Sequence, residues 1–162
     1  MQEIAYANNV LGVVYYYQHL WEQALEYYQK SLSIQEKISD QWGTANSMNN
    51  IGNIYDMTYH WEKSLEYYQK SLELREALGN QAGVATSCNN LGHIYQELGN
   101  YDEAVRYLER SLVIQKQLKN ELGYAVAYGN LGMVYQKKHL WNSATEHLQE
   151  CLNILQKLNS TE

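Results

Sequence analysis

The chain has 162 residues, enough for one domain with a sizeable core. Its content of 45% apolar and 19% charged residues excludes wholesale disorder. The net charge of −6, with no basic cluster beyond Lys137 and Lys138, counts against a nucleic-acid-binding protein, because such proteins neutralise phosphates with basic side chains. The absence of proline permits long helices without a break.

The predicted elements follow a repeat of forty residues. A Leu-Gly or Ile-Gly pair, with a tyrosine three residues after the glycine, recurs in each of four units, 1–40, 41–80, 81–120 and 121–160. Residues 21–38 and 61–78 are identical at eleven of eighteen positions. Each unit has the periodicity of two amphipathic helices. In chain order, the eight expected helices are 2–18, 21–38, 41–58, 61–78, 81–98, 101–118, 121–138 and 141–158.

Residues at the expected helix boundaries support this division. Asp40, Asn80 and Asn120 each precede the first helix of a unit, where a side-chain oxygen can accept a hydrogen bond from a free backbone N–H group. Gly79 suits the left-handed turn that commonly ends a helix. Asn100 and Glu103 have the spacing of a capping box, in which each side chain accepts a bond from the other residue's backbone.

A glycine stands in the middle of the first helix of every unit, where it costs about 0.5–1 kcal/mol relative to alanine. The four glycines are Gly12, Gly52, Gly92 and Gly132. Four such penalties at one register position predict a close approach by the second helix of the same unit. The expected contact is a column of small residues on that helix, namely Ala24, Ser64, Ala104 and Ala144.

The pattern Leu-Gly-x-x-Tyr, followed by the small residue of the second helix, resembles the tetratricopeptide repeat along the whole chain. The period of forty and the missing proline resemble the longer variant found in cell-polarity adaptors, kinesin light chains and bacterial signalling arrays. The resemblance implies an all-α helical-hairpin repeat solenoid of four repeats and eight antiparallel helices. It also implies a right-handed superhelix whose first helices line a concave surface that binds proteins or peptides.

The residue pattern offers no group of side chains for catalysis. The histidines do not converge at metal-ligand spacing, the glycines are isolated rather than grouped in a phosphate-binding loop, and neither Cys88 nor Cys151 has an activating neighbour in sequence. We therefore expect no enzyme, no metal and no cofactor. Two cysteines without a disulfide framework, no apolar run of about 18 residues and no signal peptide predict a cytoplasmic protein that does not contact a membrane.

The candidate binding residues form one stripe along the first helices, which by resemblance faces the concave groove. Only six of the charged side chains lie in the first-helix segments, so the stripe is polar but holds few charges, unlike an ordinary solvated face. Asparagine both donates and accepts hydrogen bonds, so one asparagine could meet about every third residue of an extended peptide. The stripe consists of Asn9, Asn46, Asn49, Asn50, Asn53, Asp56, Asn89, Asn90, His93, Gln96, Asn130, Met133 and Gln136, with Thr86 and Val126 at the same register.

An alternative for this stripe is that Asn50, Asn90 and Asn130 bond to one another within the array. The groove positions hold no lysine or arginine, so the clamp that some tetratricopeptide repeats use for an acidic C-terminal carboxylate is not expected. The acidic balance favours a neutral or basic protein partner, mainly through the rate of encounter.

The two ends of the repeat array predict self-association. In the first helix Tyr6 and Val10 stand where repeat two has Asn46 and Asn50, beside the apolar Tyr17. In the last helix Leu155 stands where earlier repeats have Gln35, Arg75 and Gln115, beside Leu148 and Leu152. Burying one such side chain is favourable by about 1.5–3 kcal/mol, so we expect these patches to meet further repeats of a parent protein or another copy of the chain. The alternative function is therefore an architectural or regulatory arm of a larger protein.

Overall fold

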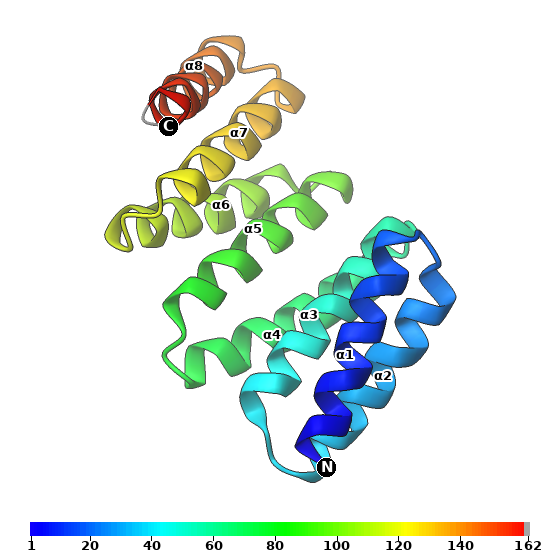
Figure 1. Cartoon of the computed structure of the whole chain (residues 1–162). Coiled ribbons are helices and arrows are strands. Elements are labelled where there is room, and N and C mark those ends of the chain that lie inside the picture. Colours follow the sequence, from blue (N-terminus) through cyan, green and yellow to red (C-terminus); the bar gives the residue numbers. More distant parts are fainter. Residues whose placement is uncertain (161–162) are drawn as a thin grey trace. The chain divides into compact units, whose positions relative to one another are not determined.

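The computed structural model describes residues 1–160, which form eight α-helices and no strand (Figure 1). They are α1 (Gln2–Tyr17), α2 (Trp21–Lys37), α3 (Gln41–Met57), α4 (Trp61–Ala77), α5 (Gln81–Glu97), α6 (Tyr101–Gln117), α7 (Glu121–Lys137) and α8 (Trp141–Asn159). Each boundary lies within one residue of its predicted position, which confirms the helical interpretation of the forty-residue period. In this described part of the chain, no helix is both long enough and apolar enough to cross a bilayer.

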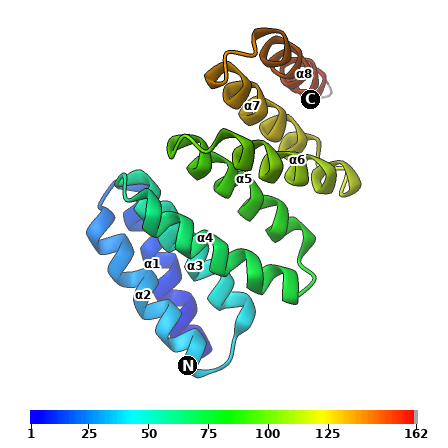
Figure 2. The ribbon, with the colours of Figure 1, turned by 180° about the vertical axis from the view of Figure 1, so that it is seen from behind.

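The helices fall into two compact units, Met1–Asn80 with α1 to α4 and Gln81–Glu162 with α5 to α8. Within the first unit α1 packs on α2, α2 on α3, and α3 on α4. Within the second unit α5 packs on α6, α6 on α7, and α7 on α8, and α5 also touches α7. Each unit therefore contains two successive helical hairpins, also visible from behind in Figure 2, and the all-α hairpin-repeat fold is confirmed. The superhelix stays a prediction.

All seven links between helices use the same tight turn. After α4, the N–H of Gly79 donates to the carbonyl of Glu76 at 3.0 Å, and the N–H of Asn80 donates to the carbonyl of Arg75 at 2.9 Å. This pair of bonds is a Schellman motif, and it places Gly79 in the left-handed region with φ +66°, as predicted. Five other links place a side chain in that strained region, at His19, Ser39, Tyr59, Lys119 and His139.

Two of the predicted helix caps are confirmed and one is wrong. Asp40 Oδ1 accepts from the N–H of Gly43 at 2.9 Å, and Asn120 Oδ1 accepts from that of Gly123 at 3.1 Å. The expected capping box of Asn100 and Glu103 is absent, since the Asn100 side chain makes no cap bond. Glu103 instead accepts from the Arg106 guanidinium on the next turn, at 2.9 Å from Nε, because a charged donor competes successfully for its carboxylate.

The mid-helix glycines do mark a close approach, but the predicted neighbour needs correction. A Cβ at Gly52 would lie 2.6 Å from a ring carbon of Tyr68, and one at Gly92 would lie 2.5 Å from Leu108 Cγ. The large residues of the second helix, rather than the small column, therefore fill the space above each glycine. The small column lies beside this contact, where Ser64 Oγ donates to the carbonyl of Gly52 at 3.0 Å.

A repeated hydrogen bond joins the two helices of three hairpins. Ser31, Ser71 and Ser111, all fully buried, donate from Oγ to the carbonyls of Ala5, Ala45 and Ala85 at 2.8, 2.8 and 2.9 Å. The fourth hairpin has the half-buried, free thiol of Cys151 at this register. Each bond joins residues 26 positions apart in sequence. It therefore helps to fix how the two helices of a hairpin are aligned along their length.

Candidate functional site

The second unit contains an open hollow of about 560 Å³, called here the α5–α7 hollow because these helices supply most of its lining. Four of the predicted stripe residues line it, namely Asn89, Asn90, His93 and Asn130. Thr86 and Val126, at the same register, line it as well. The predicted stripe therefore converges on one concave feature in repeats three and four.

Sequence reasoning missed four lining residues of the α5–α7 hollow, namely Gln115, Asn120, Leu122 and Gly123. Gln115 lies near the end of α6 and is buried, and its Oε1 accepts from Asn120 Nδ2 at 2.8 Å. The recurring polar residue at this register of the second helix, with Gln35 and Arg75 in earlier repeats, was the signal for it. A buried polar residue on the second helix can reach the groove through the gap between first helices.

The lining of the α5–α7 hollow is polar and carries no acidic or basic side chain other than His93. Asn89 Oδ1 is buried and has no hydrogen-bond partner in the described part of the chain. The half-buried Asn130 side chain makes no hydrogen bond to residues 1–160. The hollow therefore offers amide donors and acceptors that a bound molecule can pair with.

The stripe behaves differently in the first unit, where its amides bond within the chain. Asn50 Nδ2 donates to Asn9 Oδ1 at 3.2 Å, a bond that is not part of the ladder of Asn50, Asn90 and Asn130 considered as an alternative. Asn53 Oδ1 accepts from the Tyr68 hydroxyl at 2.7 Å, and burial raises the pKa of that hydroxyl, so it stays a donor. These side chains bond to other residues of the first unit and have less capacity left for a ligand.

A buried arginine completes this internal network. Arg75 of α4 is 6% exposed, and its Nη1 and Nη2 donate to Asn49 Oδ1 and Asn46 Oδ1, each at 3.2 Å. Burial lowers the pKa of this guanidinium, but an arginine remains charged at any physiological pH. The stripe positions themselves hold no lysine or arginine, but the long Arg75 side chain extends to Asn46 and Asn49 from the neighbouring helix.

The remaining predicted stripe residues lie on the same helices but outside the α5–α7 hollow. Gln96 is half-buried and donates from Nε2 to Glu97 Oε1 at 3.2 Å. Met133 and Gln136 are exposed along α7, and Asp56 is half-buried near the end of α3. The stripe as a whole is thus longer than the hollow that a ligand would enter.

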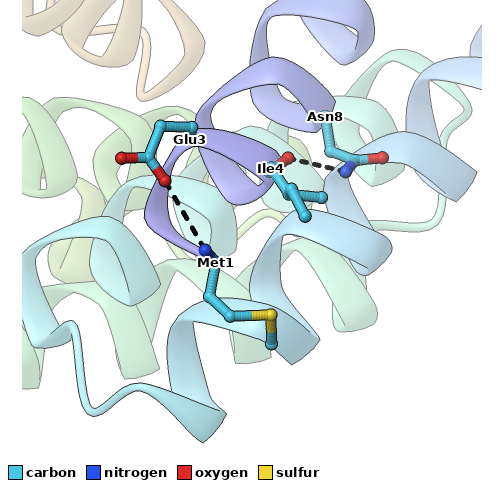
Figure 3. A network of polar contacts seen from close by, with 4 residues as sticks. All are labelled: Met1, Glu3, Ile4 and Asn8. Carbon is cyan, nitrogen blue, oxygen red and sulfur yellow. Dashed lines mark hydrogen bonds and ion pairs between the residues drawn. The ribbon is translucent and has the colours of Figure 1, made fainter.

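The first helix exposes more apolar surface than the sequence indicated. The predicted edge residues Tyr6, Val10 and Tyr17 are exposed, but so are Ile4, Leu11 and Val14 on another face of α1. Leu11 is 41% exposed, whereas Ile51 and Leu91 at the same register are fully buried. Figure 3 shows the start of this helix, where Met1 contacts Glu3 and Asn8 Nδ2 donates to the carbonyl of Ile4 at 2.7 Å.

On the last helix the predicted edge residues Leu148 and Leu152 are exposed, and Leu155 is half-buried. Leu148 stands at the register of Tyr28 and Leu108, which are buried under the first helix of the following repeat. Both α1 and α8 therefore expose faces whose counterparts elsewhere in the chain are packed between helices.

Within residues 1–160, no three His, Cys, Asp or Glu side chains lie close enough together to hold a metal ion. A family model described as Tetratricopeptide repeat matches residues 3–77 and 83–157. The chain belongs to the tetratricopeptide-repeat family. Tetratricopeptide repeats generally act as non-catalytic scaffolds that bind other proteins, so the family agrees with a site made of amides rather than of catalytic groups.

Solved structures share this tetratricopeptide-repeat fold. They include BtubC (BKLC) from P. vanneervenii (24% identity, TM-score 0.88), the apo form of RapI (23%, 0.91) and a Rap protein complexed with Competence and Sporulation Factor (23%, 0.86). The matches cover 96%, 98% and 94% of this chain, which spans 64%, 58% and 43% of those proteins. Likeness at this identity shows the fold. A search of curated protein sequences gave no match.

Proposed function

We propose that the chain is a peptide-binding scaffold whose α5–α7 hollow holds an extended segment of a partner protein. The observation that carries this proposal is the hollow itself, an open space of about 560 Å³ lined by amides that include Asn89, Asn90 and Asn130. Amide side chains pair with a peptide backbone whatever the peptide's own side chains are. The Rap protein that shares the fold was solved with a bound factor, which supports a binding role for such an array.

The partner is neutral or basic and meets the protein in the cytoplasm. No acidic or basic side chain other than His93 lines the hollow, so a clamp for an acidic C-terminal carboxylate has no cation to use. The net charge of −6 raises the rate of encounter with a basic partner.

The experiment is a screen of a 12-residue peptide library against the folded chain, followed by calorimetry on the best binder. The paired substitution Asn90→Ala and Asn130→Ala should weaken binding about fivefold to a hundredfold, since each uncharged hydrogen bond contributes about 0.5–1.5 kcal/mol. Asn142→Ala, at an exposed asparagine of α8, is the matched control and should leave the affinity unchanged. Equal affinity for the parent and the paired variant would contradict the proposal.

The second candidate is an architectural or regulatory arm that associates through its ends. The observation that favours it is the exposure of Leu11 on α1 and Leu148 on α8, at registers that are buried between helices elsewhere in the chain. Tyr6, Val10 and Tyr17 add a second exposed apolar face on α1, and Leu152 and Leu155 extend the face of Leu148 on α8.

A further inference from the structure

Repeat two contains an internal example of how this scaffold holds an arginine. The guanidinium of Arg75 is buried between α4 and α3, with Nη1 on Asn49 Oδ1 and Nη2 on Asn46 Oδ1, each at 3.2 Å. Both acceptors are neutral amides on one face of α3. The planar guanidinium fork matches two acceptors at once, which a point-like ammonium does not.

Forty residues later the same three positions hold different side chains and no arginine. Thr86, Asn89 and Gln115 replace Asn46, Asn49 and Arg75, and all three line the α5–α7 hollow. Gln115 is shorter than arginine, and its Oε1 is held by Asn120 Nδ2 at 2.8 Å. Asn89 Oδ1 therefore stays buried without a hydrogen-bond partner in the described residues. A buried acceptor in this state costs free energy until a donor reaches it.

We propose that the α5–α7 hollow binds the guanidinium of an arginine side chain from the partner, at the place that Arg75 occupies in repeat two. This inference rests on the proposed peptide-binding function and names the side chain that the hollow selects. Asn89 Oδ1 accepts one N–H group. Thr86 Oγ1 accepts a second through a free lone pair, because its own hydrogen goes to the carbonyl of Ala82 at 3.1 Å.

The surroundings suit a cation of this shape. The lining carries no lysine or arginine, so no cation in the hollow repels the guanidinium. A guanidinium is more weakly hydrated than an ammonium, so moving it into a neutral amide site costs less. The net charge of −6 attracts a basic segment from a distance.

The test uses the capped tripeptide Ac-Gly-Arg-Gly-NH2, with the citrulline and lysine tripeptides as matched probes. Citrulline keeps the shape of arginine but removes the charge. Each probe is titrated into the full ¹⁵N-labelled chain, and the Asn89 side-chain amide and the backbone amides of 86–90 are followed by NMR. We expect saturable shifts with arginine and at least about fivefold weaker binding of both other probes. No saturable shift with arginine, or equal binding of citrulline, would overturn the proposal.

Two variants test the same place from the protein's side. Gln115→Arg should supply an internal guanidinium to Asn89, abolish tripeptide binding and raise the melting temperature. Gln35→Arg, the same change in repeat one, is its control and should leave tripeptide binding unchanged. Asn89→Leu should weaken tripeptide binding about tenfold or more, because it removes the acceptor. This variant tests the site even if Gln115→Arg does not fold. Unchanged binding to Asn89→Leu would contradict the proposal.

The outcomes separate this inference from the proposed function. A library peptide that depends on Asn90 and Asn130 but binds equally after its arginines are replaced by citrulline overturns the arginine site alone. Saturable tripeptide binding that is lost in Asn89→Leu, with no library peptide bound, supports the arginine site and contradicts the extended-peptide function.

Discussion

At the scale of single residues, Cys151 stands where the other three hairpins place a buried serine. The Ser111 hydroxyl donates to the carbonyl of Ala85 at 2.9 Å, and the corresponding acceptor in the last hairpin is the carbonyl of Ala125. A thiol is a much weaker donor than a hydroxyl. The last hairpin therefore lacks the hydroxyl donor of this repeated bond.

We predict that Cys151→Ser raises the free energy of unfolding by about 0.5–1.5 kcal/mol, because it restores a neutral hydrogen bond between α8 and α7. Urea denaturation followed by circular dichroism measures the change. Ser111→Ala, which removes the same bond from a fully buried site and leaves an acceptor without its donor, should lower the free energy of unfolding by about 1–3 kcal/mol. A Cys151→Ser variant with a lower free energy of unfolding than the parent would show that the serine does not form this hydrogen bond in the last hairpin.

At the scale of elements, each three-residue link between two helices holds its second residue in the left-handed region. Gly79 and Gly99 adopt this conformation without strain, whereas Lys119 adopts it with φ +54° and an exposed side chain. A side chain in this region costs about 1 kcal/mol or more relative to glycine. The strain is local because the hydrogen bonds of the turn are the same at every link.

Lys119→Gly should therefore stabilise the protein by about 1 kcal/mol, less the entropy that glycine adds to the unfolded chain. Gly99→Ala, the reverse change at a link with nothing within 4 Å of the new Cβ, should destabilise it by a similar amount. Chemical denaturation of both variants gives the two values. Stabilisation by Gly99→Ala would mean that the left-handed turn is not retained in solution.

The elements show where prediction from sequence succeeds. The eight helices were predictable because the forty-residue register repeats without proline, so each link aligns with two or three others. The bond from Arg75 to Asn49 was not predictable, because it joins residues 26 positions apart and depends on how two antiparallel helices face each other. The sequence did locate the asparagine stripe. For the same reason it did not predict that the amides are hydrogen-bonded in repeat two whereas Asn89 Oδ1 in repeat three has no partner in the described residues.

At the scale of the whole molecule, the exposed faces of α1 and α8 predict head-to-tail association. Leu11 and Leu152 are exposed, and each belongs to a helix face that is packed against a neighbouring helix in other repeats. A contact between two different faces need not close into a ring, so we expect the oligomer to grow with concentration. Sedimentation velocity over about a hundredfold concentration range measures this growth.

Leu11→Asn and Leu152→Gln should each reduce the association, because each removes one of the two faces. A mixture of the two variants should form dimers and no larger oligomer, since each variant keeps the face that the other lacks. Val10→Asn tests, in the same way, the edge of α1 that the sequence predicted. A parent chain that stays monomeric over the whole range would contradict the association.

The most direct measurement of the proposed binding function is an NMR map of the full chain with the tightest library peptide. We expect the largest shifts at the backbone and side-chain amides of Asn89, Asn90 and Asn130, with little change along the exposed face of α6 that contains Val113. Shifts centred on that face of α6, or spread evenly over both units, would contradict binding in the α5–α7 hollow.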